Sequence, residues 1–178
     1  MILVLLGTQN NSFHRLLEEI EKNITNGNIT DKVIIQSGFT KYESDKMKIF
    51  DMIPQEELNN IIKKADLVIT HGGVGSIMSA VKMGKKVIAV PRLKKYGEHV
   101  NDHQLEIINT FKKQGIIIGI NNVEELAQAL IDVKNIQTKD INSGENKIVQ
   151  IIDNFIQNDI NKRNNKEHKW FNGRRKNN

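Results

Sequence analysis

The regular alternation of short apolar runs with amphipathic segments is the feature of this chain that most constrains its fold. Six apolar runs are short enough to be buried strands: residues 2–6, 33–36, 47–52, 67–70, 86–90 and 116–120. Apolar residues in the other segments recur every three or four positions, which is helical spacing. These segments are residues 13–24, 54–62, 74–83, 101–113, 123–133 and 147–157. The alternation predicts an α/β fold with a parallel, doubly wound, Rossmann-like sheet.

The chain is long enough for one folded domain and a tail. Its 178 residues, 38% of them hydrophobic, suffice for a single core. We expect a domain over residues 1–157 and a basic, disordered tail over 158–178, where Asn, Lys and Arg dominate. Residues 161–178 hold seven Lys or Arg against one acid, so the rest of this +5 chain is close to neutral at −1. The basic charge therefore belongs to the tail, and we predict no nucleic-acid partner.

Composition also bears on the compartment. The chain has no cysteine, which excludes disulfides and thiolate metal sites. Its uninterrupted apolar runs are far shorter than the roughly 20 residues that a membrane helix needs. Residues 1–6 are too short for a signal peptide and have no basic region before them. These observations predict a cytoplasmic protein.

A glycine-rich turn follows the fourth apolar run and is a candidate phosphate site. Residues 71–76 read HGGVGS and lead into the helical segment 74–83. Unpaired backbone N–H groups and the helix dipole attract anions at such a helix start, and missing Cβ atoms let a ligand come close. The dinucleotide fingerprint fails because Met78 stands at the third glycine position, and there is no Walker sequence. An ordinary strand–helix turn is the alternative interpretation.

Two groups of polar residues flank this turn. His71 ends the preceding strand, where it could donate a hydrogen bond to phosphate or serve only structure. The loop after residues 86–90 offers donors and acceptors suited to a sugar, at Glu98, His99, Asn101, Asp102 and Gln104. A solvated loop with a capping Asn101 or Asp102 is the alternative. A metal at His99 and His103 is disfavoured because no Glu follows His99, and no D-x-D pair is present to hold a metal-bound nucleotide.

Together these segments resemble the carboxyl-terminal half of family 28 glycosyltransferases. The matching segments are residues 4–9, 69–76, 84–86, 90–92 and 96–104. The resemblance covers about residues 1–155 in order. It is strongest to the small subunits of two-component enzymes of capsule and exopolysaccharide synthesis, including a lipid-linked glucose β-1,4-galactosyltransferase. It extends more distantly to the subunit that adds the second N-acetylglucosamine to dolichol diphosphate.

The resemblance implies half of a GT-B fold that binds a nucleotide sugar. His71, Gly72, Gly73, Gly75 and Ser76 would hold the donor diphosphate, with Thr8 near it. The donor sugar would face Glu98, His99, Asp102 and Gln104. Many relatives carry a Glu three residues after the serine of the turn for the ribose hydroxyls, whereas this chain has Ser79 there. Ribose recognition is therefore not assigned.

The implied reaction is inverting, metal-independent transfer of a hexose, with galactose favoured, from a UDP-sugar to a polyprenyl-diphosphate-linked sugar. His71 would stabilise the leaving diphosphate, and Glu98 or His99 would be the general base unless a partner supplies it. No cofactor is implied. Two alternatives stay open: a noncatalytic nucleotide-sugar-binding subunit, and a nucleotide-dependent enzyme unrelated to sugars.

A partner and a membrane follow from the same expectation. One half of a GT-B enzyme leaves the acceptor unpositioned, so we expect a membrane-anchored, acceptor-binding partner subunit. The helical segment 147–157 is one possible contact surface, unless it packs on its own sheet. The tail places Trp170 and Phe171 among seven cations, which suits weak binding to an anionic membrane surface or simply disorder. We therefore expect a peripheral location at the inner face of the cell membrane.

Overall fold

A computed structural model describes residues 1–135 of the chain. The domain boundary predicted at residue 157, the helix predicted over 147–157 and the basic tail lie outside the described residues. Within residues 1–135, six strands and their intervening helices form the predicted α/β unit.

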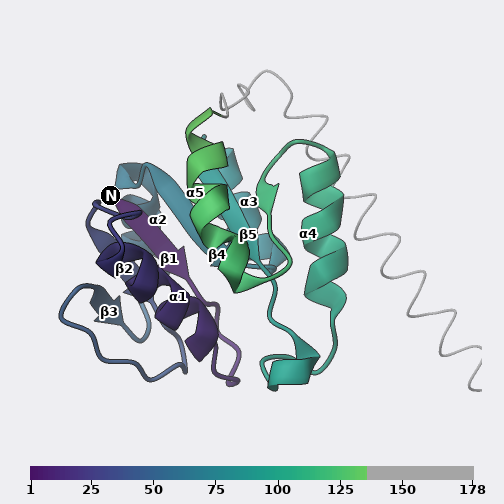
Figure 1. The fold of residues 1–178 in the computed structure, drawn as a ribbon, viewed down its shortest axis with the longest axis horizontal. Coiled ribbons are helices and arrows are strands. Elements are labelled where there is room, and N and C mark those ends of the chain that lie inside the picture. The colour runs from purple at the N-terminus through teal and green to yellow at the C-terminus, as the bar shows by residue number, and fades with distance from the viewer. Residues whose placement is uncertain (136–178) are drawn as a thin grey trace, which may run out of the picture. The chain divides into compact units, whose positions relative to one another are not determined.

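All six strands run parallel in one sheet, as the alternation predicts (Figure 1). They are β1 (Ile2–Leu5), β2 (Val33–Gln36), β3 (Lys48–Phe50), β4 (Leu67–His71), β5 (Lys86–Val90) and β6 (Ile118–Gly119), in the order β3-β2-β1-β4-β5-β6. The chain fills one side of β1 first and then returns to fill the other. The reversal leaves a topological switch point between β1 and β4, where ligands bind in sheets of this kind.

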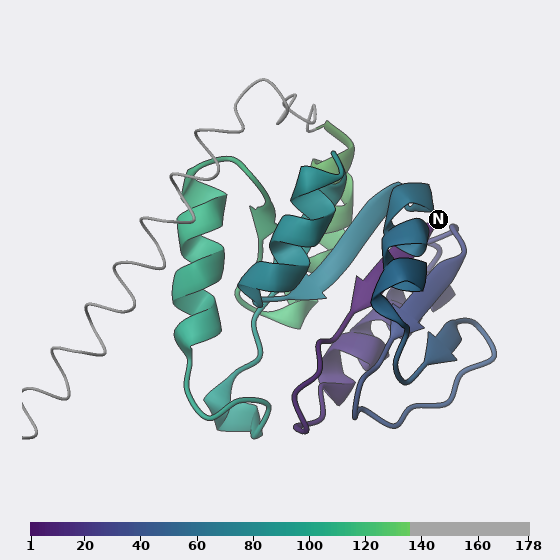
Figure 2. The ribbon, with the colours of Figure 1, turned by 180° about the vertical axis from the view of Figure 1, so that it is seen from behind.

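Helices cover both faces of the sheet. They are α1 (His14–Thr25), α2 (Gln55–Lys64), α3 (Val74–Lys82), α4 (His103–Lys113) and α5 (Leu126–Asn135), with the short 3₁₀ helices η1 (Lys94–Tyr96) and η2 (Val123–Glu125). α1 and α5 lie on the face seen in Figure 1, and α2 and α3 lie on the face seen in Figure 2, with α4 beside β6. This two-sided cover explains why the strands are apolar throughout rather than alternating.

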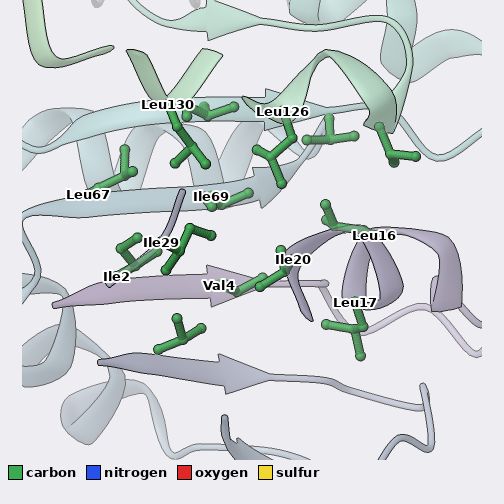
Figure 3. Close-up of a cluster of buried hydrophobic side chains, with 14 of the residues drawn as sticks. Ile2, Val4, Leu16, Leu17, Ile20, Ile29, Leu67, Ile69, Leu126 and Leu130 are labelled. Atoms are coloured by element: carbon green, nitrogen blue, oxygen red, sulfur yellow. The ribbon is translucent and has the colours of Figure 1, made fainter. Parts of the chain in front are cut away.

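The core between the sheet and α1 is shown in Figure 3, where side chains of α1 and α5 meet those of β1 and β4. Leu16, Leu17 and Ile20 of α1 are fully buried. Each such side chain stabilises the fold by about 1.5–3 kcal/mol through burial of apolar surface. This packing fixes α1, and with it the loop between β1 and α1, against the carboxyl edge of the sheet.

Most helix and strand ends differ from prediction by one to three residues. Ser12 does not cap α1; the helix starts one residue later than expected, and Thr40 Oγ1 accepts the Phe13 N–H at 3.0 Å instead. The segment before α4 contains η1, which the sequence analysis missed because three residues are too few to show a helical period. The strand predicted over 116–120 is reduced to β6, because only two of its residues pair with β5.

Candidate functional site

The candidate site lies at the switch point, beyond the carboxyl ends of β1, β4 and β5. Leu5 pairs with Thr70, and His71 pairs with Val90, so these three strands end side by side. Their loops carry most of the residues predicted to bind a donor. The structure therefore brings the glycine turn, Thr8 and the loop after β5 to one edge of the sheet.

His71 occupies the centre of this edge, between two glycines. A Cβ on Gly7 would lie 2.6 Å from the His71 ring, and one on Gly73 would lie 2.3 Å from Nε2. Both positions must therefore be glycine for the imidazole to fit. Its Nδ1 is 3.3 Å from the Leu5 carbonyl oxygen and 3.5 Å from Thr70 Oγ1.

The hydrogen bond to Leu5 decides what His71 can offer a ligand. A carbonyl oxygen only accepts, so the hydrogen belongs on Nδ1, and Nε2 of the neutral ring carries a lone pair. Burial lowers the pKa of His71 to about 4; the hydrogen bond to the Leu5 carbonyl oxygen opposes this shift, and the nearby charge of Arg92 adds to it. At neutral pH, His71 is therefore uncharged and presents an acceptor at Nε2.

The first turn of α3 has backbone N–H groups that no side chain caps. Gly73 stands at the N-cap and has no side chain to accept from the first turn. A Cβ on Gly75 would meet nothing within 4 Å, so the space beside this residue is open. Ser79 donates to the Gly75 carbonyl oxygen at 2.9 Å. The geometry leaves the N–H groups of residues 74–76 available to an anion, assisted by the helix dipole.

Gln104 fastens the glycine turn to the loop after β5. Its side chain is 5% exposed, and Oε1 accepts both the Gly72 N–H at 2.9 Å and the Arg92 N–H at 3.0 Å. Asp102 is exposed and accepts the Lys94 N–H at 2.8 Å. Thr8 is also exposed, directly after Gly7. Of the residues predicted to face the donor, Gln104 thus holds the loops together, while Asp102 and Thr8 lie on the open side.

Glu98 is buried in a charge cluster. It is 4% exposed and accepts two hydrogen bonds from Arg15, at 2.7 and 2.9 Å, and one from the Leu93 N–H at 2.9 Å. Arg15 also donates to the Pro91 carbonyl oxygen at 2.6 Å. Both carboxylate oxygens are occupied, so Glu98 orders its loop, and this geometry does not favour a role as general base.

Arg92 completes this cluster and was not predicted to have a role. Its side chain is fully buried, and its guanidinium donates only to carbonyl oxygens, the shortest bonds being 2.7 Å to Leu6 and 2.7 Å to Asn11. Burial lowers its pKa to about 10, while Glu98 acts in the opposite direction. A cation two residues after the apolar run Val87–Val90 was the signal in the sequence, since such a residue must be buried or bound at the strand end.

His99 lies beside Gln9, at the end of the loop after β5 that carries Glu98. Its Nδ1 accepts the Asn101 N–H at 3.2 Å, and its Nε2 lies 3.2 Å from Nε2 of the Gln9 amide. Asn101 in turn accepts the His103 N–H at 3.1 Å, so the start of α4 is held by local turns. The link between Gln9 and His99 joins the loops after β1 and β5 on the open side of the site.

Two hollows lie away from the glycine turn. One of about 490 Å³ is at the opposite, amino edge of the sheet and is lined by side chains of both charges, including Asp66 and Lys134. The other, of about 400 Å³, lies beside Arg15 and Tyr96. Neither hollow is lined by residues of the glycine turn. Within residues 1–135, no helix is long and apolar enough to cross a membrane.

Curated proteins similar to this chain share one name. The UDP-N-acetylglucosamine transferase subunit ALG13 of Kluyveromyces lactis is 34% identical over 88 residues, which is 49% of this chain and 43% of the relative. The subunit of the same name from Debaryomyces hansenii is 26% identical over 100 residues, or 56% of this chain and 44% of the relative. The chain thus spans less than half the length of these two relatives.

Solved glycosyltransferases share the fold. The glycotransferase of kitacinnamycin superposes with a TM-score of 0.55 and 18% identity over 75% of this chain and 34% of its own. MurG of Acinetobacter baumannii gives a TM-score of 0.52 and 17% identity over 74% of this chain and 41% of its own. The α/β unit is therefore a Rossmann-like half of a GT-B fold, as the resemblance implied.

The family assignment has the widest coverage of the three comparisons. The model of the glycosyltransferase family 28 C-terminal domain matches residues 1–163, which include every loop of the candidate site. The chain belongs to the glycosyltransferase family 28 C-terminal domain family.

Proposed function

We propose that this chain binds the nucleotide-sugar donor of a glycosyltransferase and works as one subunit of that enzyme. The observation that carries the proposal is the glycine turn at the switch point, where α3 begins without a capping side chain and Gly75 borders open space. A diphosphate bound there would be held by backbone N–H groups and the helix dipole. A UDP-sugar is the proposed donor, which agrees with the names of the curated relatives.

The proposed reaction is inverting transfer of a hexose to a polyprenyl-diphosphate-linked sugar. The family resemblance favours galactose and a role in capsule or exopolysaccharide synthesis, whereas the relatives' names make N-acetylglucosamine the second sugar to test. The leaving diphosphate gains negative charge, which the start of α3 would stabilise without a divalent cation. Asp102 and Thr8, on the open side, would contact the donor, and Ser76 would contact its phosphates.

The structure supports revised roles for the proposed catalytic residues. His71 Nε2 can accept a hydrogen bond but cannot give one. We therefore propose that it accepts a hydrogen bond from the nucleotide sugar and does not neutralise the diphosphate. The Glu98 carboxylate is paired with the Arg15 guanidinium and is not available as a base. His99 accepts the Asn101 N–H at Nδ1, so its neutral ring carries the hydrogen on Nε2, and its position beside Gln9 suits binding of the sugar rather than a role as the base.

No side chain proposed as the general base is free to act as one, which favours the second candidate function. In this function the chain is a subunit that binds the nucleotide sugar, and its partner supplies the base. We propose a membrane-anchored partner that binds the lipid-linked acceptor, because the curated relatives are named as subunits. Binding of the complex at the inner face of the cell membrane, aided by the basic tail, completes the proposal. In either case the transfer needs both halves, because the acceptor must be positioned against the donor.

Calorimetry with the purified chain and UDP, UDP-galactose, UDP-glucose, UDP-N-acetylglucosamine and NAD tests donor binding. NAD binding without UDP binding would reject the proposal. Transfer to a lipid-linked acceptor, assayed with and without membranes that supply the partner, tests the subunit role. Transfer by the chain alone would reject the partner, and loss of transfer with EDTA, restored by manganese, would reject the metal-free mechanism.

A further inference from the structure

A buried charge cluster with a net positive charge lies beside the glycine turn. It consists of the guanidinium groups of Arg15 and Arg92 and the carboxylate of Glu98. Glu98 makes its close ion pair with Arg15, at 2.7 Å, whereas Arg92 contacts only the Glu98 carbonyl oxygen, at 3.3 Å. Two cations therefore share one anion, and the cluster keeps one unit of positive charge.

Keeping this charge buried is energetically costly, so its position needs a reason. Arg92 is fully buried and is bound by carbonyl dipoles of Leu6, Asn11 and Ser12 instead of a carboxylate. Its guanidinium also stacks over the ring of Phe13, 4.9 Å from the centroid. Carbonyl and ring contacts satisfy the donors but leave the net charge uncancelled, and a charge in a low-dielectric interior acts over longer distances than one in water.

The backbone of Arg92 is linked to the proposed phosphate site through one amide. Gln104 Oε1 accepts the backbone N–H groups of both Gly72 and Arg92. The glycine turn and the Arg92 backbone therefore share a single acceptor. The guanidinium reaches in the other direction, to the loop between β1 and α1. Arg92 thus contacts the loop after β1 and shares the acceptor Gln104 with the glycine turn, and each of its guanidinium nitrogens donates to a carbonyl oxygen of the protein.

We propose that Arg92 is a positioning and electrostatic residue for the donor: it fixes the loop after β1 and supplies a buried positive charge that favours a diphosphate without touching it. This inference rests on the proposed function, because it assumes an anionic ligand at the glycine turn. Glu98 has the opposite electrostatic effect, since it cancels one of the two cations. Removal of Arg92 and removal of the Glu98 charge should therefore change the affinity for anions in opposite directions.

The test compares ligands that differ in charge: UDP, UMP, uridine and inorganic pyrophosphate, with binding measured by calorimetry. In Arg92→Met we expect UDP affinity to fall about tenfold more than uridine affinity, because a buried unit charge acts on the charged diphosphate and not on neutral uridine. Glu98→Gln should raise the ratio of UDP to uridine affinity. Arg92→Lys keeps the charge but loses the planar fork, so it should weaken all ligands to a similar degree and preserve the ratio.

A matched control separates this effect from loss of stability. Asn23 is also buried, 2% exposed, and its amide donates to Glu19 at 2.8 and 2.9 Å, but it lies near the end of α1 and away from the carboxyl edge. Asn23→Ala should lower the melting temperature and leave the ratio of UDP to uridine affinity unchanged. A ratio that is the same in wild type, Arg92→Met and Glu98→Gln would overturn the inference. Pyrophosphate binding that follows the predicted order without any preference for UDP would uphold it while rejecting the proposed function.

Discussion

Gly73 and Gly75 are two residues apart at the start of α3, but their surroundings differ completely. A Cβ on Gly73 would lie 2.3 Å from His71 Nε2, whereas a Cβ on Gly75 would meet nothing within 4 Å. We predict that Gly73→Ala displaces the imidazole and lowers both stability and UDP affinity. Gly75→Ala should stabilise the free protein by roughly 0.5–1 kcal/mol, because alanine is the better helix former, and still weaken UDP binding by crowding the phosphate. Thermal melting and calorimetry of the pair check this; unchanged UDP affinity in Gly75→Ala would place the ligand elsewhere.

His71 makes the stability of the fold depend on pH. Its folded-state pKa of about 4 lies below the ordinary value of 6.5, so the unfolded chain binds a proton more readily. The stability that neutral His71 contributes is therefore present above pH 6.5 and is lost as the pH falls toward 4. We predict that the stability advantage of wild type over His71→Asn shrinks by about 2 kcal/mol between pH 7 and pH 4, a value discounted for the partial exposure of the ring. Urea denaturation at a series of pH values measures this, and a constant difference would contradict the buried, neutral imidazole.

At the scale of elements, the side-chain oxygen of Gln104 joins the segments that follow β4 and β5, just beyond the last paired residues of these strands. In Gln104→Leu, the N–H groups of Gly72 and Arg92 lose their acceptor, and each unpaired buried donor costs about 1–3 kcal/mol. We predict a loss of about 2–4 kcal/mol in the free energy of unfolding and weaker UDP binding. Gln104→Glu keeps an acceptor for both donors, so it should retain more stability than Gln104→Leu. Its carboxylate should nevertheless weaken UDP binding by repulsion, and equal UDP affinity in wild type and Gln104→Glu would count against a phosphate at this turn.

The elements that the sequence predicted are those whose pattern is local. β2 and β5 match their predicted bounds, because an apolar run between turn residues is sufficient to define a buried parallel strand. The roles of Glu98 and Gln104 could not be predicted in the same way. Their partners, Arg15 and Gly72, are 83 and 32 residues distant in the sequence, and only the folded sheet brings them together. The residue types of the site were therefore readable from the sequence, whereas the division between ligand-facing and loop-holding residues was not.

At the scale of the whole molecule, large apolar side chains gather on the edge that carries the candidate site. Five are exposed among residues 1–135: Phe39, Met52, Tyr96, Val100 and Ile131. All but Ile131 lie in the segments that follow β2, β3 and β5 at their carboxyl ends, Tyr96 being in η1. Phe39 and Met52 come from neighbouring loops, because the Gly38 N–H donates to the Asp51 carbonyl oxygen at 2.8 Å. Exposed apolar groups concentrated on one edge are typical of a surface that a partner covers.

This distribution indicates which surface meets the proposed acceptor-binding subunit. We predict that Phe39→Asp combined with Met52→Glu leaves UDP affinity and melting temperature near wild type, because both side chains are exposed by about half. Transfer to the lipid-linked acceptor, assayed with membranes that contain the partner, should fall by at least tenfold, since a charge pressed into an apolar interface is poorly tolerated. Ile131→Asp, on α5 and away from this edge, is the matched control and should retain transfer. Full transfer by the Phe39 and Met52 double variant would show that the partner approaches the donor site from another side.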